Sequence, residues 1–317
     1  MSKRNIIDFS SNIFEPKQVL YNNNQYTLYL ARFKGLHDLY NYLKSDPKIN
    51  KKVFRELASI TGEEDFAGKP YKDAVEDLIS ITDPGYDEFL KLQGNINKAI
   101  KLDVHKYKTV KTVSGGRLNI PAYSAGVPLC YETEEKISKP KFIRINVSLS
   151  YGWTTSSKQV YNRAVILTNI VKALEASGYS VDVKTFELSH NENEIIHVSV
   201  DVKRHGERIN MQTLYKSLCH REFLRRILFR VLETLDVKSD WSDGYGYTCS
   251  EEMSRSILKI NKNDLYFDAP NRMRIRGNDL SEDFESVINI LNLADKFDVD
   301  EAKKIFKEQS KKLELKR

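Results

Sequence analysis

The hydrophobic positions between residues 141 and 187 change period along the chain. Ile143, Ile145, Val147 and Leu149 alternate with polar residues, which predicts a β-strand with one buried face. After a loop rich in Gly, Ser and Thr (150–157), apolar residues recur at helical spacing on one face: Val160, Ala164, Leu167, Val171 and Leu174. Residues 179–186 alternate again and predict a second strand.

Two signals bound the helix between these strands. Ser156 or Ser157 suits its N-cap, and Gly178 suits the left-handed position at its C-terminal end. A strand–helix–strand unit of this kind predicts two parallel strands with a right-handed crossover. Because α/β proteins place their sites at the carboxyl ends of such strands, residues 148–157 are the first place to look for function.

The chain before this unit predicts a mostly helical N-terminal portion, residues 1–104, with one strand at 25–31. Helices are expected at 36–43, 52–60, 73–82 and 89–100. Strand-like patterns then follow at 105–113 and 118–120. The Pro- and Gly-containing segment that follows, 121–132, is interpreted as a buried linker into the central strand.

The chain after the unit completes an α/β core domain, residues 105–300, with a mixed sheet centred on the strand at 141–150. Strands are expected at 194–203 and 264–268, and helices at 211–235 and 283–297. The last segment, 301–317, is expected to be a charged tail.

Composition narrows the class of protein. The 317 residues are 40% hydrophobic and 30% charged, which predicts a folded chain. No apolar run reaches the length of a membrane span, and the first residues lack an apolar signal core, so we expect no membrane contact and no export. The widely spaced Cys130, Cys219 and Cys249 favour a cytoplasmic location without a disulfide framework or structural zinc.

The segment Asn146-Val147-Ser148-Leu149-Ser150 resembles the DxSxS motif of von Willebrand factor A domains. The resemblance covers residues 141–190 and implies a Rossmann-type core with a Mg²⁺ site at Asn146, Ser148 and Ser150. A hard cation prefers carboxylate oxygens, and Asn146 supplies none. The expected site is therefore degenerate, with weak Mg²⁺ binding at most and no other cofactor; Thr248 and Asp268 are further candidate ligands from chain order.

A wider resemblance covers residues 105–235. The segments SGGRLNIPAYSAGVPLCYE, NRAVILTNIVKALEASGYSVDV and LYKSLCHREFLRRILFRVLE are similar to an uncharacterised family of tailed-phage and prophage proteins. This implies action in the cytoplasm of a host cell, with a place in the virion left open. Because von Willebrand A-like cores often serve as adaptors of hexameric ATPases, the two resemblances together imply a non-enzymatic interaction protein whose partner is an ATPase or a phage assembly component.

A nucleic-acid-binding protein is the first alternative. The net charge of +6 permits it, and arginines gather in two segments. The candidate phosphate or partner contacts are Arg221, Arg225 and Arg226 on the 211–235 helix, and Arg272, Arg274 and Arg276.

A metal-dependent hydrolase is the second alternative. It would assemble paired carboxylates such as Asp264 with Asp268, or Asp240 with Asp243. However, the phosphate-loop, nucleophile-elbow, zinc-protease and dinucleotide-binding motifs are all missing from the sequence. We therefore predict a protein that is not an enzyme.

Overall fold

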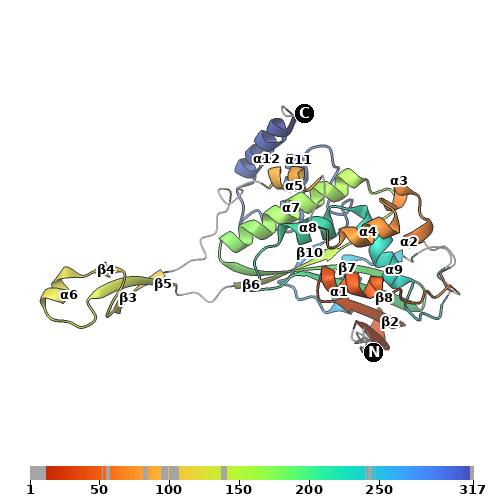
Figure 1. Ribbon diagram of the computed structural model, residues 1–317, viewed down its shortest axis with the longest axis horizontal. Coiled ribbons are helices and arrows are strands. Elements are labelled where there is room, and N and C mark those ends of the chain that lie inside the picture. The colour runs from red at the N-terminus through yellow and green to blue at the C-terminus, as the bar shows by residue number, and fades with distance from the viewer. Residues whose placement is uncertain are drawn as a thin grey trace, which may run out of the picture.

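The computed structural model describes residues 12–51, 53–54, 58–80, 85–93, 99, 107–136, 141–239, 241, 245 and 247–314. They form a main body built on a seven-stranded mixed sheet, and a small three-stranded sheet that stands apart from it (Figure 1). The main path runs in the order β1-β2-β8-β7-β6-β10, and β9 pairs with β7. Its strands are β1 (Ile13–Tyr21), β2 (Asn24–Phe33), β6 (Lys141–Ser148), β7 (Tyr179–His190), β8 (Glu194–Lys203), β9 (Tyr247–Thr248) and β10 (Leu265–Phe267).

The predicted strand–helix–strand unit is present. Strands β6 and β7 are parallel and are joined by helix α7 (Ser157–Ala176). Ser156 caps the helix in a reciprocal capping box with Gln159, and Gly178 adopts φ 85° after its end. All five residues of the predicted apolar face are buried, which confirms that face: Val160, Ala164, Leu167, Val171 and Leu174.

The two faces of the main sheet are covered unequally. One face, here the helical face, packs Ile145, Val183 and Val198 against α7 and most other helices in one large core. The opposite face, here the open face, has a smaller core that includes Phe186, Leu188 and residues of α10 (Glu251–Leu258). Part of the open face therefore remains accessible to solvent.

The remaining helices of the body belong to the helical face or its periphery. Among the described helices none is long and apolar enough to cross a membrane. They are α1 (Leu36–Lys44), α2 (Ala58–Thr61), α3 (Glu64–Ala67), α4 (Tyr71–Asp77), α5 (Tyr86–Lys91), α8 (Met211–Leu218), the π-helix η3 (Phe223–Leu228), α9 (Phe229–Leu232), α11 (Leu280–Ile290) and α12 (Val299–Glu314).

Several sequence expectations need correction. The strand at 141–150 is not central, because only the three-residue β10 lies beyond β6. The N-terminal portion adds two strands to the main sheet rather than one; β1 carries Pro16 and lies at the sheet edge, where a missing backbone donor is tolerated. The predicted 52–60 helix begins only at Ala58, and Val53 and Phe54 lie outside it; residues 52 and 55–57 lie outside the described residues.

The expected long helix at 211–235 is interrupted. It divides into α8, the π-helix η3 and α9, although its predicted apolar stripe is buried. The helix expected at 283–297 ends at Ile290 as α11. Leu293 and Phe297 are therefore buried in place of Ile290 and Ala294. The C-terminal segment forms α12, whose Phe306 packs against Phe284 of α11.

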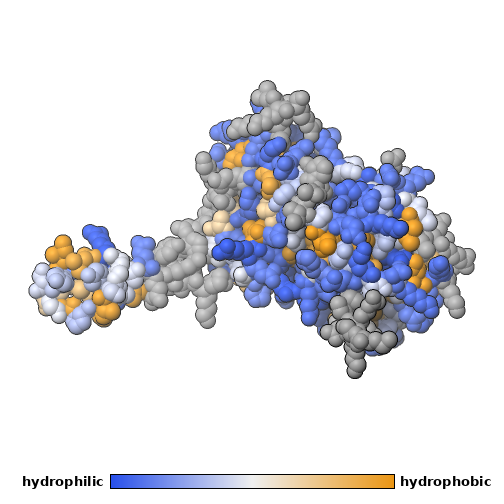
Figure 2. Space-filling model, in the orientation of Figure 1, coloured by the Kyte–Doolittle hydropathy of each residue, from blue (hydrophilic) through white to orange (hydrophobic). Residues whose placement is uncertain are grey.

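The segment interpreted as a buried linker is instead part of the small sheet. Strands β3 (Tyr107–Thr112), β5 (Tyr131–Lys136) and β4 (Arg117–Leu118) pair antiparallel in that order, and helix α6 (Ile120–Ser124) follows β4. Figure 2 shows apolar residues on the surface of this unit. Six of the fifteen exposed large hydrophobic residues of the described chain lie there: Val113, Leu118, Ile120, Tyr123, Val127 and Leu129.

Candidate functional site

The strand order identifies one place where an α/β protein would bind a ligand. Counted from β6, the order β8-β7-β6-β10 is 3-2-1-4, with β6, β7 and β10 parallel and β8 antiparallel to β7. The order reverses between β6 and β10, and crevices at such switch points hold ligands in doubly wound sheets. Ser148, Ser150 and Asp268 lie at the carboxyl ends of these two strands.

The serines at this switch point bond to the backbone. The hydroxyl of Ser150 donates to the carbonyl of Leu188 at 3.2 Å and accepts from the Leu188 amide at 3.0 Å. The hydroxyl of Ser148 accepts from the Ser150 amide at 3.4 Å. Both serines are buried: Ser150 joins the end of β6 to β7, and Ser148 bonds within its own segment, so the two hydroxyls do not face a shared ligand.

Two arginines stand where a divalent cation would lie. The buried Arg163 of α7 donates to the Ser148 carbonyl at 2.6 Å. Arg272 donates to Thr248 at 3.2 Å and pairs with Asp268 at 3.4 Å, so the two candidate ligands from chain order do lie together, but around a guanidinium. Asn146 faces away and lines a hollow on the open face. These residues do not fit the Mg²⁺ site that the motif implies, because fixed positive charges already neutralise the available oxygens.

A buried carboxyl group lies on the helical side of the switch point. Glu187 of β7 is 3% exposed, and one of its oxygens has no hydrogen-bond partner among the described residues. Burial raises the pKa of Glu187 to about 7, and the neighbouring Ser150 hydroxyl offsets part of this rise. Asp264 and Asp268 flank opposite ends of β10, about 13 Å apart along a strand, so they cannot share one metal ion. Asp240 and Asp243 lie outside the described residues.

The expectation of an accessible arginine stripe is wrong for Arg225 and Arg226. Both are at most 2% exposed. Arg226 donates to the carbonyls of Ser59, Ile60, Gly62, Gly68 and Lys69, at 2.7 to 3.3 Å. Arg225 donates to the carbonyls of Phe66 and Gly152 and stacks on the Phe66 ring at 4.2 Å. The π-helix places these consecutive residues against one irregular segment, and Arg221 beside them is half-buried.

The second arginine segment is partly available. Arg272, Arg274 and Arg276 are exposed and alternate with the buried Met273 and Ile275, as the sequence pattern predicts. Arg272 is occupied by Asp268, Thr248 and the Cys249 carbonyl. The two arginine segments therefore do not form one basic surface.

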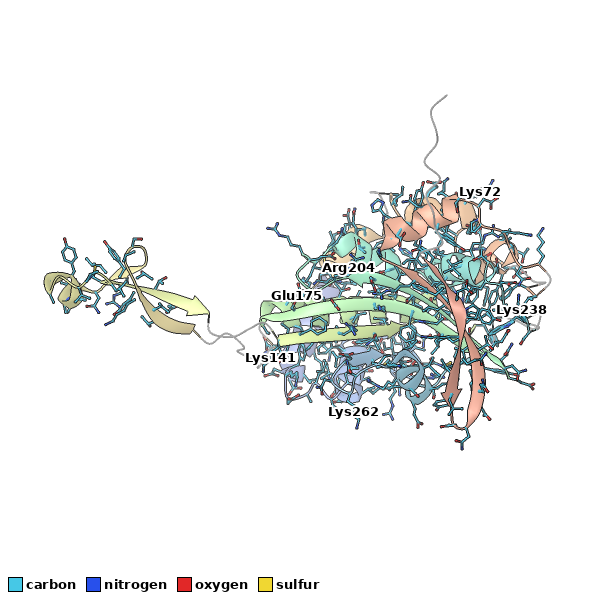
Figure 3. All side chains as sticks on the ribbon, turned by 90° about the horizontal axis from the view of Figure 1, so that it is seen from below. Lys72, Lys141, Glu175, Arg204, Lys238 and Lys262 are labelled. Atoms are coloured by element: carbon cyan, nitrogen blue, oxygen red, sulfur yellow. The ribbon has the colours of Figure 1, made fainter. Side chains whose placement is uncertain are left out.

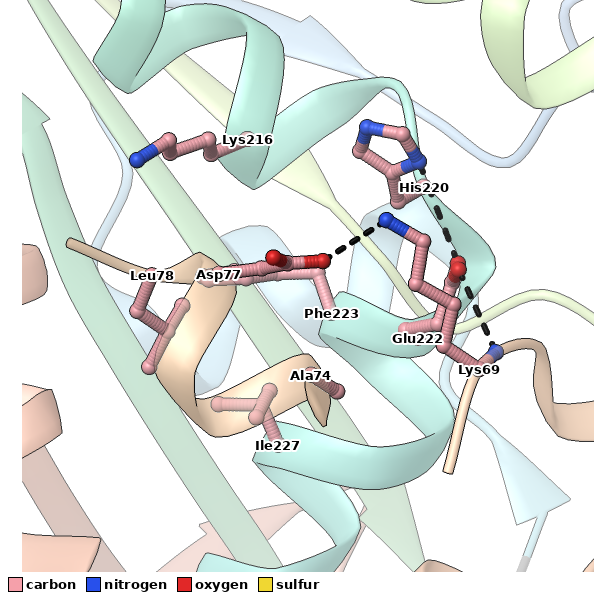
Figure 4. A pocket seen from close by; sticks show the side chains of 9 residues that line it. All are labelled: Lys69, Ala74, Asp77, Leu78, Lys216, His220, Glu222, Phe223 and Ile227. Carbon is pink, nitrogen blue, oxygen red and sulfur yellow. Dashed lines mark hydrogen bonds and ion pairs between the residues drawn. The ribbon is translucent and has the colours of Figure 1, made fainter. Parts of the chain in front are cut away.

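A small cavity lies between α4 and η3, and the residues that line it join these two helices (Figure 4). It encloses about 30 Å³, the space of about one water molecule. Lys69 pairs with Asp77 at 2.7 Å, and the Lys69 amide donates to Glu222 at 3.3 Å. Gly68, at φ 78°, lets the backbone approach Glu222, because a Cβ there would lie 2.4 Å from that side chain. The cavity is too small for an organic ligand.

Polar side chains from three neighbouring strands converge on the open face. In register, Asn146 of β6 pairs with Lys184 of β7, and Lys184 with Asp201 of β8. Since neighbouring strands are about 4.8 Å apart, these side chains converge. Two adjoining hollows of about 220 and 100 Å³ share Arg144 and Lys184; we call them together the open-face groove.

The floor of the open-face groove holds two buried nitrogens without partners among the described residues. They are Nδ2 of Asn146 and Nε2 of His197, in side chains 4% and 8% exposed. Burial, with the nearby cations Lys184, Lys17 and Arg32, lowers the pKa of His197 to about 3. The imidazole is therefore neutral at pH 7 and carries one N–H.

Sequence reasoning missed most of this groove. Asp182, Lys184 and Asp201 alternate with valines, and such a pattern is typical of an ordinary solvent face. The available signal was that cations from three separate strands, Arg32, Arg144 and Lys184, fall on the face opposite the core valines.

Comparison with known proteins identifies the family. A family described as a domain of unknown function (DUF7192) matches residues 15–296. The chain belongs to this family. No curated protein and no solved structure matches it. The family description assigns no activity to any residue of the groove or the switch point.

Proposed function

We propose that this protein is a non-enzymatic interaction protein that binds a protein partner through its small sheet, residues 107–136. The observation that carries the proposal is the exposed apolar surface of that sheet. Ile120 and Tyr123 are 68% and 62% exposed, and Cys130 is the one buried residue among those of the small sheet whose burial is described. Three short strands without a core gain stability only by packing on another surface.

The free edge of β3 offers a second means of contact. This strand pairs with β5 alone among the described strands, so its other edge presents backbone donors and acceptors. A partner strand can add to such an edge, with apolar side chains supplying specificity. The small sheet stands outside the main body, where a partner can reach both its edge and its apolar side chains (Figure 1).

The adaptor role belongs to this proposal. The parallel β6–α7–β7 unit supports a von Willebrand A-like core, and the arginine-filled switch point supports a core that binds without metal-dependent chemistry. Following the sequence resemblance, the protein acts in a phage-infected or prophage-carrying cell. The first partner to test is an ATPase encoded near its gene, and the second is a phage assembly component.

The test measures binding of the full-length protein to the products of neighbouring genes. We expect the double substitution Ile120→Ser and Tyr123→Ser to weaken one such complex at least about tenfold, because buried apolar anchors dominate interfaces. Leu20→Ser is the matched control, since Leu20 is 67% exposed but lies on β1 of the main body. A complex unaffected by the double substitution, or equally weakened by the control, would overturn the proposal. Sedimentation of the protein alone shows whether it self-associates. This distinguishes a second copy of the chain from a different protein as the partner.

A further inference from the structure

The open-face groove contains two buried nitrogens that no group in the described part of the chain satisfies. An unpaired buried polar nitrogen is costly, so native structures rarely leave one without a reason. Asn146 and His197 line the same hollow, beside Lys184 and Arg144. An oxygen-bearing ligand in that hollow would accept from Nδ2 of Asn146, and from Nε2 of His197 in the tautomer that carries the proton there.

The side chains around the groove carry more positive than negative charge. Asp201 pairs with Arg32 at 3.0 Å, Lys184 at 3.5 Å and Arg204 at 3.9 Å. Asp182 pairs with Arg144 at 3.6 Å. Of the five permanent cations that line this hollow, Lys203 is matched by Glu175, so four cations face two carboxylates. Two positive charges remain unmatched, which suits a dianion.

The neighbouring groups on the same face leave this excess in place. His205 contacts Asp182 at 3.3 Å, and Lys203 turns to the helical side, where it pairs with Glu175. Lys259 and Asp264 line the far hollow and offset one another. The excess therefore lies around Asp201, whose single carboxylate faces three cations, whereas Arg144 is matched by Asp182. Lys184 belongs to this excess and, like Arg144, borders both hollows.

We propose that the open-face groove binds a small molecule bearing a phosphate monoester. The phosphate lies beside Lys184 and Arg144, which border both hollows, and its oxygens or those of the attached group accept from Nδ2 of Asn146 and from Nε2 of His197, which carries the ring proton. A phosphate monoester carries close to two negative charges at pH 7 and has several strong acceptors. The two hollows, of about 220 and 100 Å³, exceed the space of a few water molecules, so a phosphate with a small attached group has room.

The geometry favours a small ligand over a nucleic-acid strand. Asn146 and His197 are buried at the floor of the groove, whereas Arg32 and Arg204 lie near its rim with side chains 49% and 43% exposed. A compact anion that enters the groove reaches both levels. A continuous phosphate backbone would contact only the rim cations and would leave the floor donors unpaired.

Titration calorimetry on the full-length protein tests the proposal with AMP, glucose 6-phosphate and inorganic phosphate as probes, and with adenosine and glucose as uncharged counterparts. We expect at least one monoester to bind with a Kd below about 1 mM, and the uncharged counterparts to show no binding. Asn146→Leu and Lys184→Met should each weaken binding about tenfold or more, which corresponds to about 1.4 kcal/mol. Inorganic phosphate competing for the same site would support the phosphate as the recognised group.

Lys72→Met is the matched control, because Lys72 is an exposed lysine on α4, well separated from Arg204 in Figure 3. Circular dichroism and thermal melts confirm that each variant is folded before titration. The proposal is overturned if none of the monoesters binds, if binding survives both groove substitutions, or if a labelled oligonucleotide binds more tightly than every monoester and loses affinity with Lys184→Met.

Discussion

The two faces of the main sheet use the same residue types in opposite ways. On the helical face, Arg226 gives its donors to five backbone carbonyls, and Arg225 is enclosed by Phe66 and Gly152. On the open face, Arg144 and Lys184 border a groove in which Asn146 and His197 keep unpaired nitrogens. The difference is in the partners of the buried donors: backbone carbonyls satisfy Arg226 on the helical face, whereas the unpaired nitrogens on the open face are the observation behind the proposed phosphate site.

The largest expected effect that tests this contrast between the two faces comes from substitution of Arg226. We expect Arg226→Met to lower the free energy of unfolding by about 3–5 kcal/mol, because several buried carbonyls lose their donor at once. Urea unfolding measures it. Arg276→Met, at an exposed position, should stay within about 0.5 kcal/mol of the wild type. A loss below about 1 kcal/mol for Arg226→Met would mean that this guanidinium is not structural.

Glu187 provides the next largest effect. Its folded pKa, about 7, lies above its ordinary value of 4.5, so the folded protein favours the protonated form. The stability that this group contributes is fully present below pH 4.5 and is lost as the pH rises through about 7, a change of about 3 kcal/mol. Relative to the wild type, Glu187→Gln should therefore gain up to about 3 kcal/mol between pH 4.5 and pH 8. Urea unfolding at both pH values checks the sign, and a relative loss at pH 8 would contradict the assignment.

Substitution of Asn146 should have a smaller effect on the unfolding free energy and tests the same contrast between the two faces. Because Nδ2 of Asn146 has no partner in the described part of the chain, Asn146→Leu should leave the unfolding free energy unchanged or raise it by up to about 1 kcal/mol. Asn162 is the matched control, since its buried amide donates to Asp283 at 2.8 Å, and Asn162→Leu should cost about 1–3 kcal/mol. Thermal and urea melts compare the two. Equal losses in both variants would show that the Asn146 amide is structural after all.

The smallest expected effect concerns Lys184. Its pair with Asp201 spans 3.5 Å, and the Lys184 side chain is 25% exposed. Lys184→Met should change the unfolding free energy by about 0–1 kcal/mol, because partly exposed ion pairs contribute little. Unfolding at low and high salt measures this contribution. A loss near that of Arg226→Met would place Lys184 with the structural cations and remove the contrast between the two faces.

Local patterns predicted the parts of the fold whose signals are contained within a few turns. The alternation at 194–203 matches β8, and the Ser156 cap with its apolar stripe matches α7. By contrast, β5 reads Tyr-Glu-Thr-Glu-Glu-Lys, without an apolar face, and forms because β3 and β4 pair with it. The interruption of the 211–235 helix is also a tertiary effect, since the segment at 59–69 supplies the carbonyls that bind Arg225 and Arg226.

The candidate sites show the same division between features that the sequence predicted and features that tertiary contacts decided. The sequence singled out Asn146, and the structure retains it, but on the open face with Lys184 and His197 instead of beside Ser150. Periodicity alone cannot show which of two polar residues in a strand will find a partner. That depends on the neighbours two and three strands away, which the chain reaches only through sheet register.

The sequence by itself determined the α/β class, the parallel β6–α7–β7 unit and the burial of its apolar stripe, because hydrophobic period and helix caps act over a few residues. The tertiary structure alone decided which charges were satisfied. Arg225 and Arg226 became structural because distant carbonyls surround them, and Arg144 and Lys184 stayed available because no helix covers them among the described elements. Charge is encoded by residue type, but its use is fixed by the partners that long-range packing brings within hydrogen-bond distance.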